Sequence, residues 1–247
     1  MSILITGATG AIGYGITLKL SDRDYEFIIA CRDLSKGKIL AGDLAYDFGL
    51  KAEVIHLDLS SSESVLKVVS DLGSTKIQGI INNAGVMNGS FKLDPDGYED
   101  TLNVNYHNTR LLTEKLIPNI EPGGAIVFTT SATRHWYPFQ KLRENVSEKE
   151  FGRLKTYALS KKLITRYALQ LAARLKERQI RVNCADPGVV DTPMLKMNKW
   201  FDPLTDKFFR PLCLNSFKAA NVGVRAFLSP ETGKIYSPTL SDLTSEV

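Results

Sequence analysis

The chain has 247 residues, of which 43% are apolar and 23% are charged, and its net charge is +4. This length and composition predict one globular domain, residues 1–247, with a sizeable core. The mild charge, without a run of five like charges, does not indicate nucleic-acid binding. Three scattered histidines and three widely spaced cysteines indicate neither a metal site nor a disulfide framework.

Short apolar runs alternate along the chain with amphipathic segments of helical length. Strands are predicted at 3–5, 26–30, 52–57, 77–82, 125–130, 181–185 and near 234–236. Helices are predicted at 11–21, 34–48, 62–71, 98–117, 152–177 and 216–228. The strands are almost continuously apolar, which is typical of strands covered on both faces. The α/β alternation therefore predicts a doubly wound parallel sheet.

The first predicted strand leads into a glycine-rich turn at the start of the first helix. Glycines allow a tight turn and a close approach of the backbone to a pyrophosphate, and the helix offers free amides and its positive end. The position between strand and helix predicts dinucleotide binding. The expected contacts come from Gly7, Thr9, Gly10, Ala11, Ile12 and Gly13.

The end of the second strand bears on the choice of dinucleotide. An NAD site usually places an acidic residue there to hold the ribose 2′-hydroxyl. Cys31 occupies that position and Arg32 follows it, so a forked guanidinium could bind a 2′-phosphate. Nearby Lys36 and Lys38 add positive charge. The sequence favours NADP(H) over NAD(H), although Asp33 could reach the ribose instead or cap the following helix.

Polar and small residues close the third and fourth strands. Asp58, followed by Leu59, could accept a hydrogen bond from an adenine amino group, or it could cap a helix. Asn83 could be a turn former, and the small step at Ala84 and Gly85 would let a cofactor pass close by.

Two long irregular segments follow the fifth and sixth strands, at residues 132–151 and at a substrate-loop region of about 189–215. Both leave carboxyl ends of strands, where open α/β sheets bind ligands. Their aromatic residues either line the mouth of a site for an apolar or aromatic substrate or pack a lid or a subunit contact. Their basic residues could meet an acidic substrate or be surface charges. The aromatic residues are Trp136, Tyr137, Phe139, Trp200, Phe201, Phe208 and Phe209, and the basic ones are Lys196, Lys199, Lys207 and Arg210.

Tyr157 and Lys161 lie four residues apart, so a helix would place them on one face. A fixed cation favours the phenolate and is expected to lower the pKa of Tyr157 toward the range useful for proton transfer. The same spacing also arises by chance on amphipathic helices. Ser131, at the end of the fifth strand, adds a hydroxyl that could face the same ligand.

Together these motifs resemble the short-chain dehydrogenase/reductase family. The resemblance rests on TGATGAIG, NNAG, Ser131, YALSK and PGVVDT in this order, and it runs over nearly the whole chain. The stretches ACRDLSKG, Val104-Asn105 and GKIY are similar to the NADP-linked, retinol-dehydrogenase-like and carbonyl-reductase-like members. The family implies a Rossmann-type sheet of seven strands and hydride exchange with a carbonyl or alcohol.

The resemblance also implies roles for single residues. Tyr157 matches the proton donor or acceptor, and Lys161 the lysine that binds the nicotinamide ribose and lowers the pKa of the tyrosine. Ser131 matches the hydroxyl that orients the substrate oxygen. Asn105, with Asn103 as its rival, matches the asparagine that supports a water relay to the lysine. The matching nicotinamide contacts follow the sixth strand at Pro187, Gly188, Val190 and Thr192.

One departure from the family pattern keeps other functions open. Ala11 stands where single-domain members usually have the middle glycine of the turn, so the spacing resembles that of epimerases and dehydratases. The chain has little room for their larger substrate domain. A non-catalytic dinucleotide sensor is the other alternative, although the chain keeps the residues that sensors can lose.

The sequence also bears on location and assembly. The chain leads directly from Met1 into an apolar strand, and no apolar stretch reaches about 18 residues. We therefore expect no signal peptide, no membrane anchor and a cytoplasmic location. Family likeness implies a homodimer or homotetramer.

Overall fold

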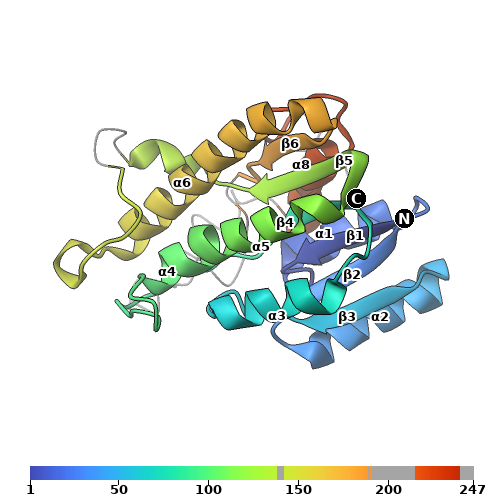
Figure 1. Cartoon of the computed structure of the whole chain (residues 1–247), viewed down its shortest axis with the longest axis horizontal. Coiled ribbons are helices and arrows are strands. Elements are labelled where there is room, and N and C mark those ends of the chain that lie inside the picture. The colour runs from blue at the N-terminus through green and yellow to red at the C-terminus, as the bar shows by residue number, and fades with distance from the viewer. Residues whose placement is uncertain (138–141, 189, 191–214, 240–247) are drawn as a thin grey trace.

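The computed structural model describes residues 1–137, 142–188, 190 and 215–239. In this part of the chain seven parallel strands form one sheet in the order β3-β2-β1-β4-β5-β6-β7 (Figure 1). They are β1 Ser2–Thr6, β2 Glu26–Cys31, β3 Ala52–His56, β4 Ile77–Asn82, β5 Ile120–Thr129, β6 Arg181–Ala185 and β7 Ile235–Tyr236. The predicted doubly wound parallel sheet is confirmed.

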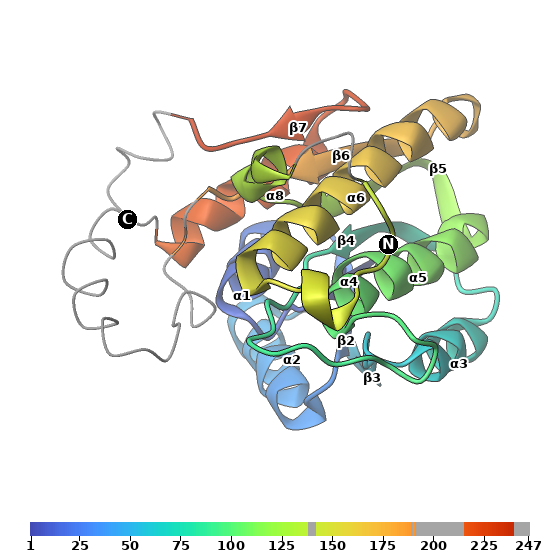
Figure 2. The same cartoon turned by 90° about the vertical axis from the view of Figure 1, so that its left-hand side faces the viewer.

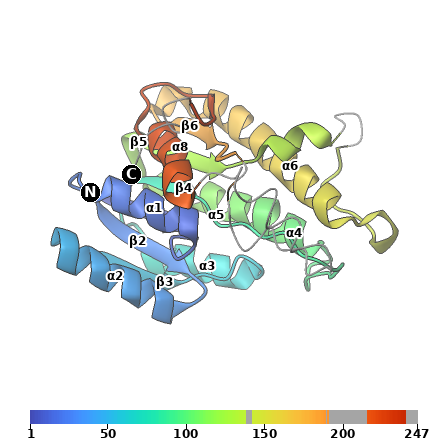
Figure 3. The same ribbon diagram turned by 180° about the vertical axis from the view of Figure 1, so that it is seen from behind.

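Helices cover both faces of this sheet. The α-helices are α1 Ala11–Leu20, α2 Leu34–Phe48, α3 Ser62–Leu72, α4 Asp100–Leu102, α5 Asn108–Leu116, α6 Arg153–Arg174 and α8 Ser216–Leu228. Shorter helical turns are η1 Asn103–His107, η2 Ile117–Asn119, η3 Ala132–Trp136, η5 Glu148–Glu150 and η6 Lys176–Arg178. Figure 1 shows α5 and α6 in front of the sheet, and Figure 3 shows α1 and α8 on the opposite side.

Alternating side chains of the strands separate the core into two layers. Leu4 of β1 packs with the buried side chains of α3, α5 and α6, whereas its neighbours Ile3 and Ile5 pack with those of α1, α2 and α8. All three side chains are fully buried. Burying one such side chain stabilises a fold by roughly 1.5–3 kcal/mol, so the central strands hold both helical layers in place.

The predicted helix at 98–117 is wrong as a single helix. The chain forms the short α4, then the π-helix η1, and only then α5. The side chains of Asn103, Asn105 and Asn108 donate to the backbone carbonyls of Ser60, Val86 and Leu59, respectively. These long-range hydrogen bonds occur where the helix widens into a π-turn, which holds one more residue than an α-helical turn. Such π-turns are frequent at functional sites.

The other predicted boundaries agree with the structure within three residues, except the start of β5. That strand was expected to begin at 125 but begins at Ile120, which pairs with Ile77 before the register shifts. The residues between, 121–124, form an irregularity that includes Gly123 with φ of 82°. An apolar pattern does not reveal such a bulge, because residues 121–123 are exposed to solvent.

The strand order reverses between β1 and β4: β2 and β3 lie on one side of β1, whereas β4 and the later strands lie on the other. In doubly wound sheets this reversal opens a crevice at the carboxyl ends of the strands. Figure 2 looks onto that edge of the molecule, with the first turns of α6 toward the viewer. Among the described residues, no helix combines the length and apolarity needed to cross a membrane.

Candidate active site

The glycine-rich turn after β1 is packed against the end of β4. Gly7 has φ of 66°, in the left-handed region. A Cβ at Gly7 would lie 2.8 Å from the Cα atom of Ala84, and a Cβ at Gly13 would lie 2.2 Å from the carbonyl oxygen of Gly7. The Asn83 side chain donates to that same carbonyl at 3.0 Å. The turn and the Asn83-Ala84 segment are therefore fixed as one unit in which larger residues would not fit.

The first turn of α1 differs from those of the neighbouring helices in its capping. Asp33 caps α2 and Ser61 caps α3 with their side chains, but the N-cap residue of α1 is Gly10, which has no side chain to cap an amide. The first turn of α1 also lacks acidic residues. The free backbone amides and the positive end of this helix suit an anion such as the pyrophosphate of a dinucleotide. The residues present thus fit the cofactor that the sequence predicts.

At the end of β2 the structure separates the three candidate ribose contacts. Cys31 is buried, with its thiol toward the carbonyl oxygen of Asp33. Asp33 Oδ1 accepts from the amides of Ser35 and Lys36 at 3.0 and 3.1 Å, so it serves as the helix cap. Arg32 is exposed. Of the two alternatives for Asp33 in the sequence, the capping role is the one observed.

Asp58 follows β3 and lies close enough to Arg32 for the positive charge to lower the pKa of its carboxyl group. Burial tends to raise the pKa of Asp58, but hydrogen bonds from Ser60 and the charge of Arg32 outweigh it and hold the pKa below its usual value. Its Oδ1 accepts from the amide and the hydroxyl of Ser60 at 2.9 and 2.8 Å. The next residue, Leu59, is buried, and its carbonyl is bound by Asn108. Asp58 therefore stays ionised at this edge of the sheet.

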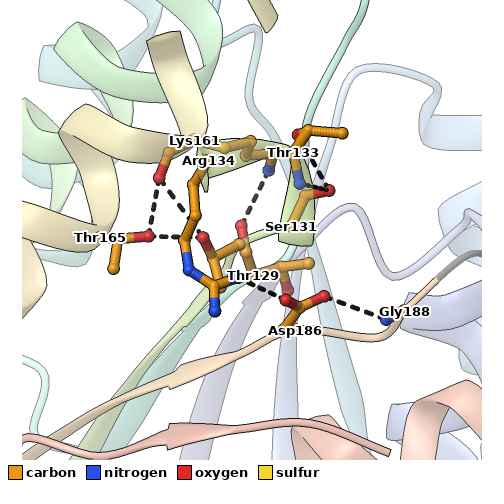
Figure 4. A network of polar contacts seen from close by, with 9 residues as sticks. Thr129, Ser131, Thr133, Arg134, Lys161, Thr165, Asp186 and Gly188 are labelled. Carbon is orange, nitrogen blue, oxygen red and sulfur yellow. Dashed lines mark hydrogen bonds and ion pairs between the residues drawn. The ribbon is translucent and has the colours of Figure 1, made fainter. Parts of the chain in front are cut away.

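Tyr157 and Lys161 lie on one face of α6, as the four-residue spacing predicts. The ammonium nitrogen of Lys161 is 5.6 Å from the centre of the Tyr157 ring. Lys161 is buried, and its ammonium donates to the carbonyl oxygen of Thr129 at 2.8 Å (Figure 4). The half-buried Tyr157 lies one turn earlier. The Thr129 carbonyl at the end of β5 thereby fixes the position of the Lys161 ammonium group.

Ser131 follows β5 and faces this pair with its hydroxyl proton available. Its Oγ accepts from the amide and the hydroxyl of Thr133 at 3.3 and 3.1 Å (Figure 4). A hydroxyl has two lone pairs and one proton, so the two contacts with Thr133 leave the proton of Ser131 to be donated. The Ser131 hydroxyl also lies close enough to the phenol of Tyr157 to lower the pKa of the tyrosine. Two proton-bearing oxygens thus lie side by side.

The expected lowering of the Tyr157 pKa is not found. Burial raises the pKa of Tyr157 to about 12, with Ser131 opposing the rise and the charge of Asp186 adding to it. The pKa of Lys161 is itself lowered to about 8, because burial disfavours its charge more than Asp186 stabilises it. The sequence argument counted the nearby cation but could not include the loss of hydration, which is the larger effect here.

The stability of the fold is expected to rise with pH because of Lys161. Its pKa falls from 10.5 to about 8 on folding. Below about pH 8 the lysine is charged in both states, and the full cost of burying the charge is present. As pH rises toward 10.5 the folded chain releases the proton first, so the free energy of unfolding increases by on the order of 3 kcal/mol.

Urea unfolding of the wild type and Lys161→Met between about pH 7 and about pH 10.5 tests this expectation. The variant lacks the titrating group but keeps every other lysine and tyrosine. The unfolding free energy of the wild type should therefore rise relative to that of the variant. A constant difference between the two proteins would contradict the lowered pKa.

Asn105 lies beside Lys161, and its rival Asn103 does not share these contacts. A Cβ at Gly85 would lie 3.3 Å from both the Asn105 Oδ1 and the Lys161 ammonium. The Asn105 side chain donates to Ser160 at 3.0 Å and exchanges hydrogen bonds with the backbone of Val86. The Asn103 side chain donates to the carbonyl oxygen of Ser60 instead. A side chain at Gly85 would therefore crowd the space between Asn105 and Lys161.

The segment after β6 reaches the same site. Gly188 has φ of 76°, and its amide donates to Asp186 Oδ1 at 3.1 Å. Val190 is buried. Thr192 lies outside the described residues, as do Phe139, Trp200, Phe201, Phe208, Phe209 and the basic residues of the substrate-loop region. Of the remaining aromatic candidates, Tyr137 packs in the core, whereas Trp136 is exposed.

The sequence analysis assigned no role to three side chains that shape this site. They are Thr133, which orients Ser131, and Arg134 and Asp186, which form a buried ion pair. No local signal identifies the pair, because its members are 52 positions apart and each resembles an ordinary surface charge. Thr133 could have been found from its position in the turn after Ser131, since a hydroxyl two residues away often bonds back.

The family model of the short chain dehydrogenases matches residues 1–201 of the chain. An uncharacterized oxidoreductase of Schizosaccharomyces pombe is 29% identical, with 94% of this chain and 73% of that protein covered. Retinol dehydrogenase 12 of Homo sapiens is 28% identical, with 95% and 77% covered. Polyprenol dehydrogenase of Homo sapiens is also 28% identical, with 92% and 72% covered.

Solved structures share the fold. A short chain dehydrogenase from Burkholderia cenocepacia in complex with NADP has a TM-score of 0.76 at 21% identity, with 95% of this chain and 94% of that chain covered. A short chain dehydrogenase from Escherichia coli complexed with NADPH has a TM-score of 0.72 at 22% identity, with 96% and 95% covered. At these identities the likeness extends to the fold alone.

Proposed function

This chain belongs to the short-chain dehydrogenase family of oxidoreductases, and on that premise we propose that it transfers a hydride between NADP(H) and a carbonyl or alcohol substrate. The observation that carries the proposal is the pairing of Ser131 and Tyr157 beside Lys161. This pairing lies at the carboxyl edge of the sheet, to which the glycine-rich turn also belongs.

In this proposal Tyr157 exchanges the proton with the substrate oxygen. The raised pKa keeps the phenol protonated at neutral pH, which is the form that reduction requires. Ser131 donates its free proton to the same oxygen as negative charge develops there, where such a donor is most effective. The carbonyl oxygen of Thr129 accepts from the Lys161 ammonium and keeps it beside the phenol, and Asn105 would support a water relay to this lysine.

Other residues would bind the cofactor. When bound, NADP(H) supplies the hydride for reduction or accepts it for oxidation. The turn from Gly7 to Gly13 and the uncapped amides of α1 would hold its phosphates. Asn83, Ala84 and Gly85 would border it, Asp58 would bind the adenine end, and Lys161 the ribose. Pro187, Gly188 and Val190, with Thr192, would meet the nicotinamide.

For the substrate we propose an apolar alcohol or the corresponding carbonyl compound. Support comes from the names of two relatives, which are a retinol dehydrogenase and a polyprenol dehydrogenase. Retinol and polyprenols are alcohols with long hydrocarbon chains. The aromatic residues of the two irregular segments agree with such a substrate, although Tyr137 is excluded because it packs in the core.

The preference for NADP(H) would depend on Arg32. The side chain is exposed at the end of β2, and the competing carboxylate of Asp33 is used as a helix cap. We expect Arg32→Ala to weaken NADPH binding about 10- to 100-fold and to spare NADH, because a charge-assisted bond to phosphate contributes about 1.5–3 kcal/mol. Fluorescence titration with both cofactors measures the two dissociation constants.

Lys38→Ala is the matched control, since it removes one positive charge from the same stretch. A general effect of charge would weaken NADPH binding alike in both variants. Equal loss of NADPH and NADH affinity in Arg32→Ala would show that this residue does not recognise the 2′-phosphate.

Oxidation of NADPH and NADH against aldehydes, ketones and quinones with increasing apolar chain length tests the function directly. We expect turnover with NADPH that improves with chain length. NADPH binding without turnover on the whole panel would favour a dinucleotide sensor. Tightly bound NAD(H) that is recycled without net consumption would favour an epimerase or dehydratase.

A further inference from the structure

A buried ion pair joins the two loops that border the candidate active site. Arg134, in η3, contacts the carboxylate of Asp186, which follows β6 (Figure 4). Their side chains are only 12% and 5% exposed. Burying two charges costs more than their attraction returns unless the geometry is good and further hydrogen bonds satisfy them. Stability alone is therefore a weak reason for a pair in this place.

The ion pair belongs to a small network of hydrogen bonds that connects these two loops. The Arg134 amide donates to the carbonyl of Ser131 at 3.0 Å, which ties the arginine to the turn that carries the serine. The second oxygen of Asp186 accepts from the Gly188 amide at 3.1 Å. The Asp186 amide donates to the backbone carbonyl oxygen of Tyr236 in β7 at 2.8 Å. The loop of Ser131 and the loop of Gly188 are thus held through one carboxylate.

We propose that the Arg134–Asp186 ion pair is a positioning device for the reaction, holding Ser131 and the Pro187-Gly188 segment in one rigid frame and placing a fixed negative charge beside Tyr157 and Lys161. This inference rests on the proposed function. Neither residue needs to touch the substrate, and their effect is exerted through Ser131, Lys161 and the backbone of Gly188.

The charge of Asp186 acts on both residues of the Tyr157–Lys161 pair. It raises the pKa of Lys161, against the larger effect of burial, and it adds to the burial that raises the pKa of Tyr157. The described residues also bring Cys184 of β6 to this cluster, and burial raises its pKa to about 12, so it stays neutral. Arg134 is the counterion of the Asp186 carboxylate. Removing either charge should change the field at Lys161 in opposite directions.

Four variants separate this role from a structural one. Asp186→Asn removes the negative charge but keeps an acceptor for the Gly188 amide, and Arg134→Met removes the positive charge. Arg134→Lys keeps the charge and loses the guanidinium fork. The double variant Arg134→Met/Asp186→Asn leaves no buried charge unpaired, so it should fold even where a single variant is unstable.

The first measurement follows the titration of Lys161 by NMR of lysine labelled with ¹³C at Cε, with Lys161→Met to assign the signal. We expect the pKa of Lys161 to fall in Asp186→Asn, to rise in Arg134→Met, and to stay near the wild-type value in Arg134→Lys. A purely structural pair would lower thermal stability without moving this titration in opposite directions.

The second measurement is steady-state turnover. Both single charge-removing variants should lower kcat by about 10- to 100-fold, since small displacements of a catalytic group have effects of this size, while the KM for NADPH changes less. Arg174→Met is the control, because it removes the Arg174–Glu114 pair on α6 and α5. It should leave both kcat and the Lys161 titration unchanged.

The two readouts keep the failures apart. A wild-type protein without turnover on any substrate would count against the proposed function, and opposite shifts of the Lys161 titration would still support the role of the pair in setting that charge. An active wild type whose variants keep kcat would overturn the positioning role. Loss of kcat with an unmoved titration in all variants would overturn the electrostatic role.

Discussion

Tyr157→Phe is expected to lower kcat by about 10²- to 10⁴-fold, the usual contribution of a positioned acid or base, while NADPH binding stays within about threefold. The substitution removes one oxygen atom and keeps the ring beside Lys161. The hydroxyl of Ser131 would remain, with both contacts from Thr133 intact. The loss should therefore fall on proton transfer and not on the shape of the site.

Tyr167→Phe is the matched control for this variant. Tyr167 lies on the same helix, but its hydroxyl donates to Glu114 at 2.9 Å, on the side of α5. Single-turnover reduction with NADPH, together with fluorescence titration of the cofactor, measures the chemical step and binding separately for both variants. Undiminished turnover in Tyr157→Phe would exclude the proton-transfer role assigned to Tyr157.

Gly13→Ala is expected to have the second large effect, on cofactor binding and on stability together. The added Cβ would lie 2.2 Å from the Gly7 carbonyl oxygen and 2.6 Å from the Asn83 side chain, closer than atoms can approach. The turn must then move away from β4. We expect NADPH binding to weaken by more than about 100-fold and the fold to lose roughly 1–3 kcal/mol.

Gly42→Ala provides the comparison for Gly13→Ala, because it is the same change inside helix α2 with no atom within 4 Å of the new Cβ. It should stabilise the protein by roughly 0.5–1 kcal/mol, as alanine favours helix over glycine. Urea unfolding and NADPH titration of both variants measure the difference. Wild-type affinity in Gly13→Ala would show that the close packing of this turn is not needed for cofactor binding.

Much of the fold was predictable because its signals are local. The apolar runs at 77–82 and 181–185 became β4 and β6 with the same bounds, and the pattern at 34–48 became α2. Such periodicities depend only on the geometry of the backbone. The π-helix at Asn103–His107 was not predictable in this way, because its asparagines bind loops that follow β3 and β4.

In the candidate site, too, the local features were predictable from the sequence and the features that depend on long-range packing were not. The neighbourhood of Tyr157 and Lys161 follows from their spacing on α6, but the direction of the tyrosine pKa was expected wrongly. Burial depends on everything packed around a side chain, and here it outweighs the nearby charge. The capping role of Asp33 lay among the alternatives of the sequence, and only the hydrogen bonds to Ser35 and Lys36 distinguished it.

The sequence by itself determined the family, the parallel α/β architecture and the order of the motifs from Gly7 to Gly188, since each motif lies within a few residues of chain. Only the tertiary structure brought Arg134 to Asp186, and only burial set the charge states of Tyr157 and Lys161. Spacing along a chain defines which side chains share one element. Long-range contacts and the loss of water define what those side chains can do.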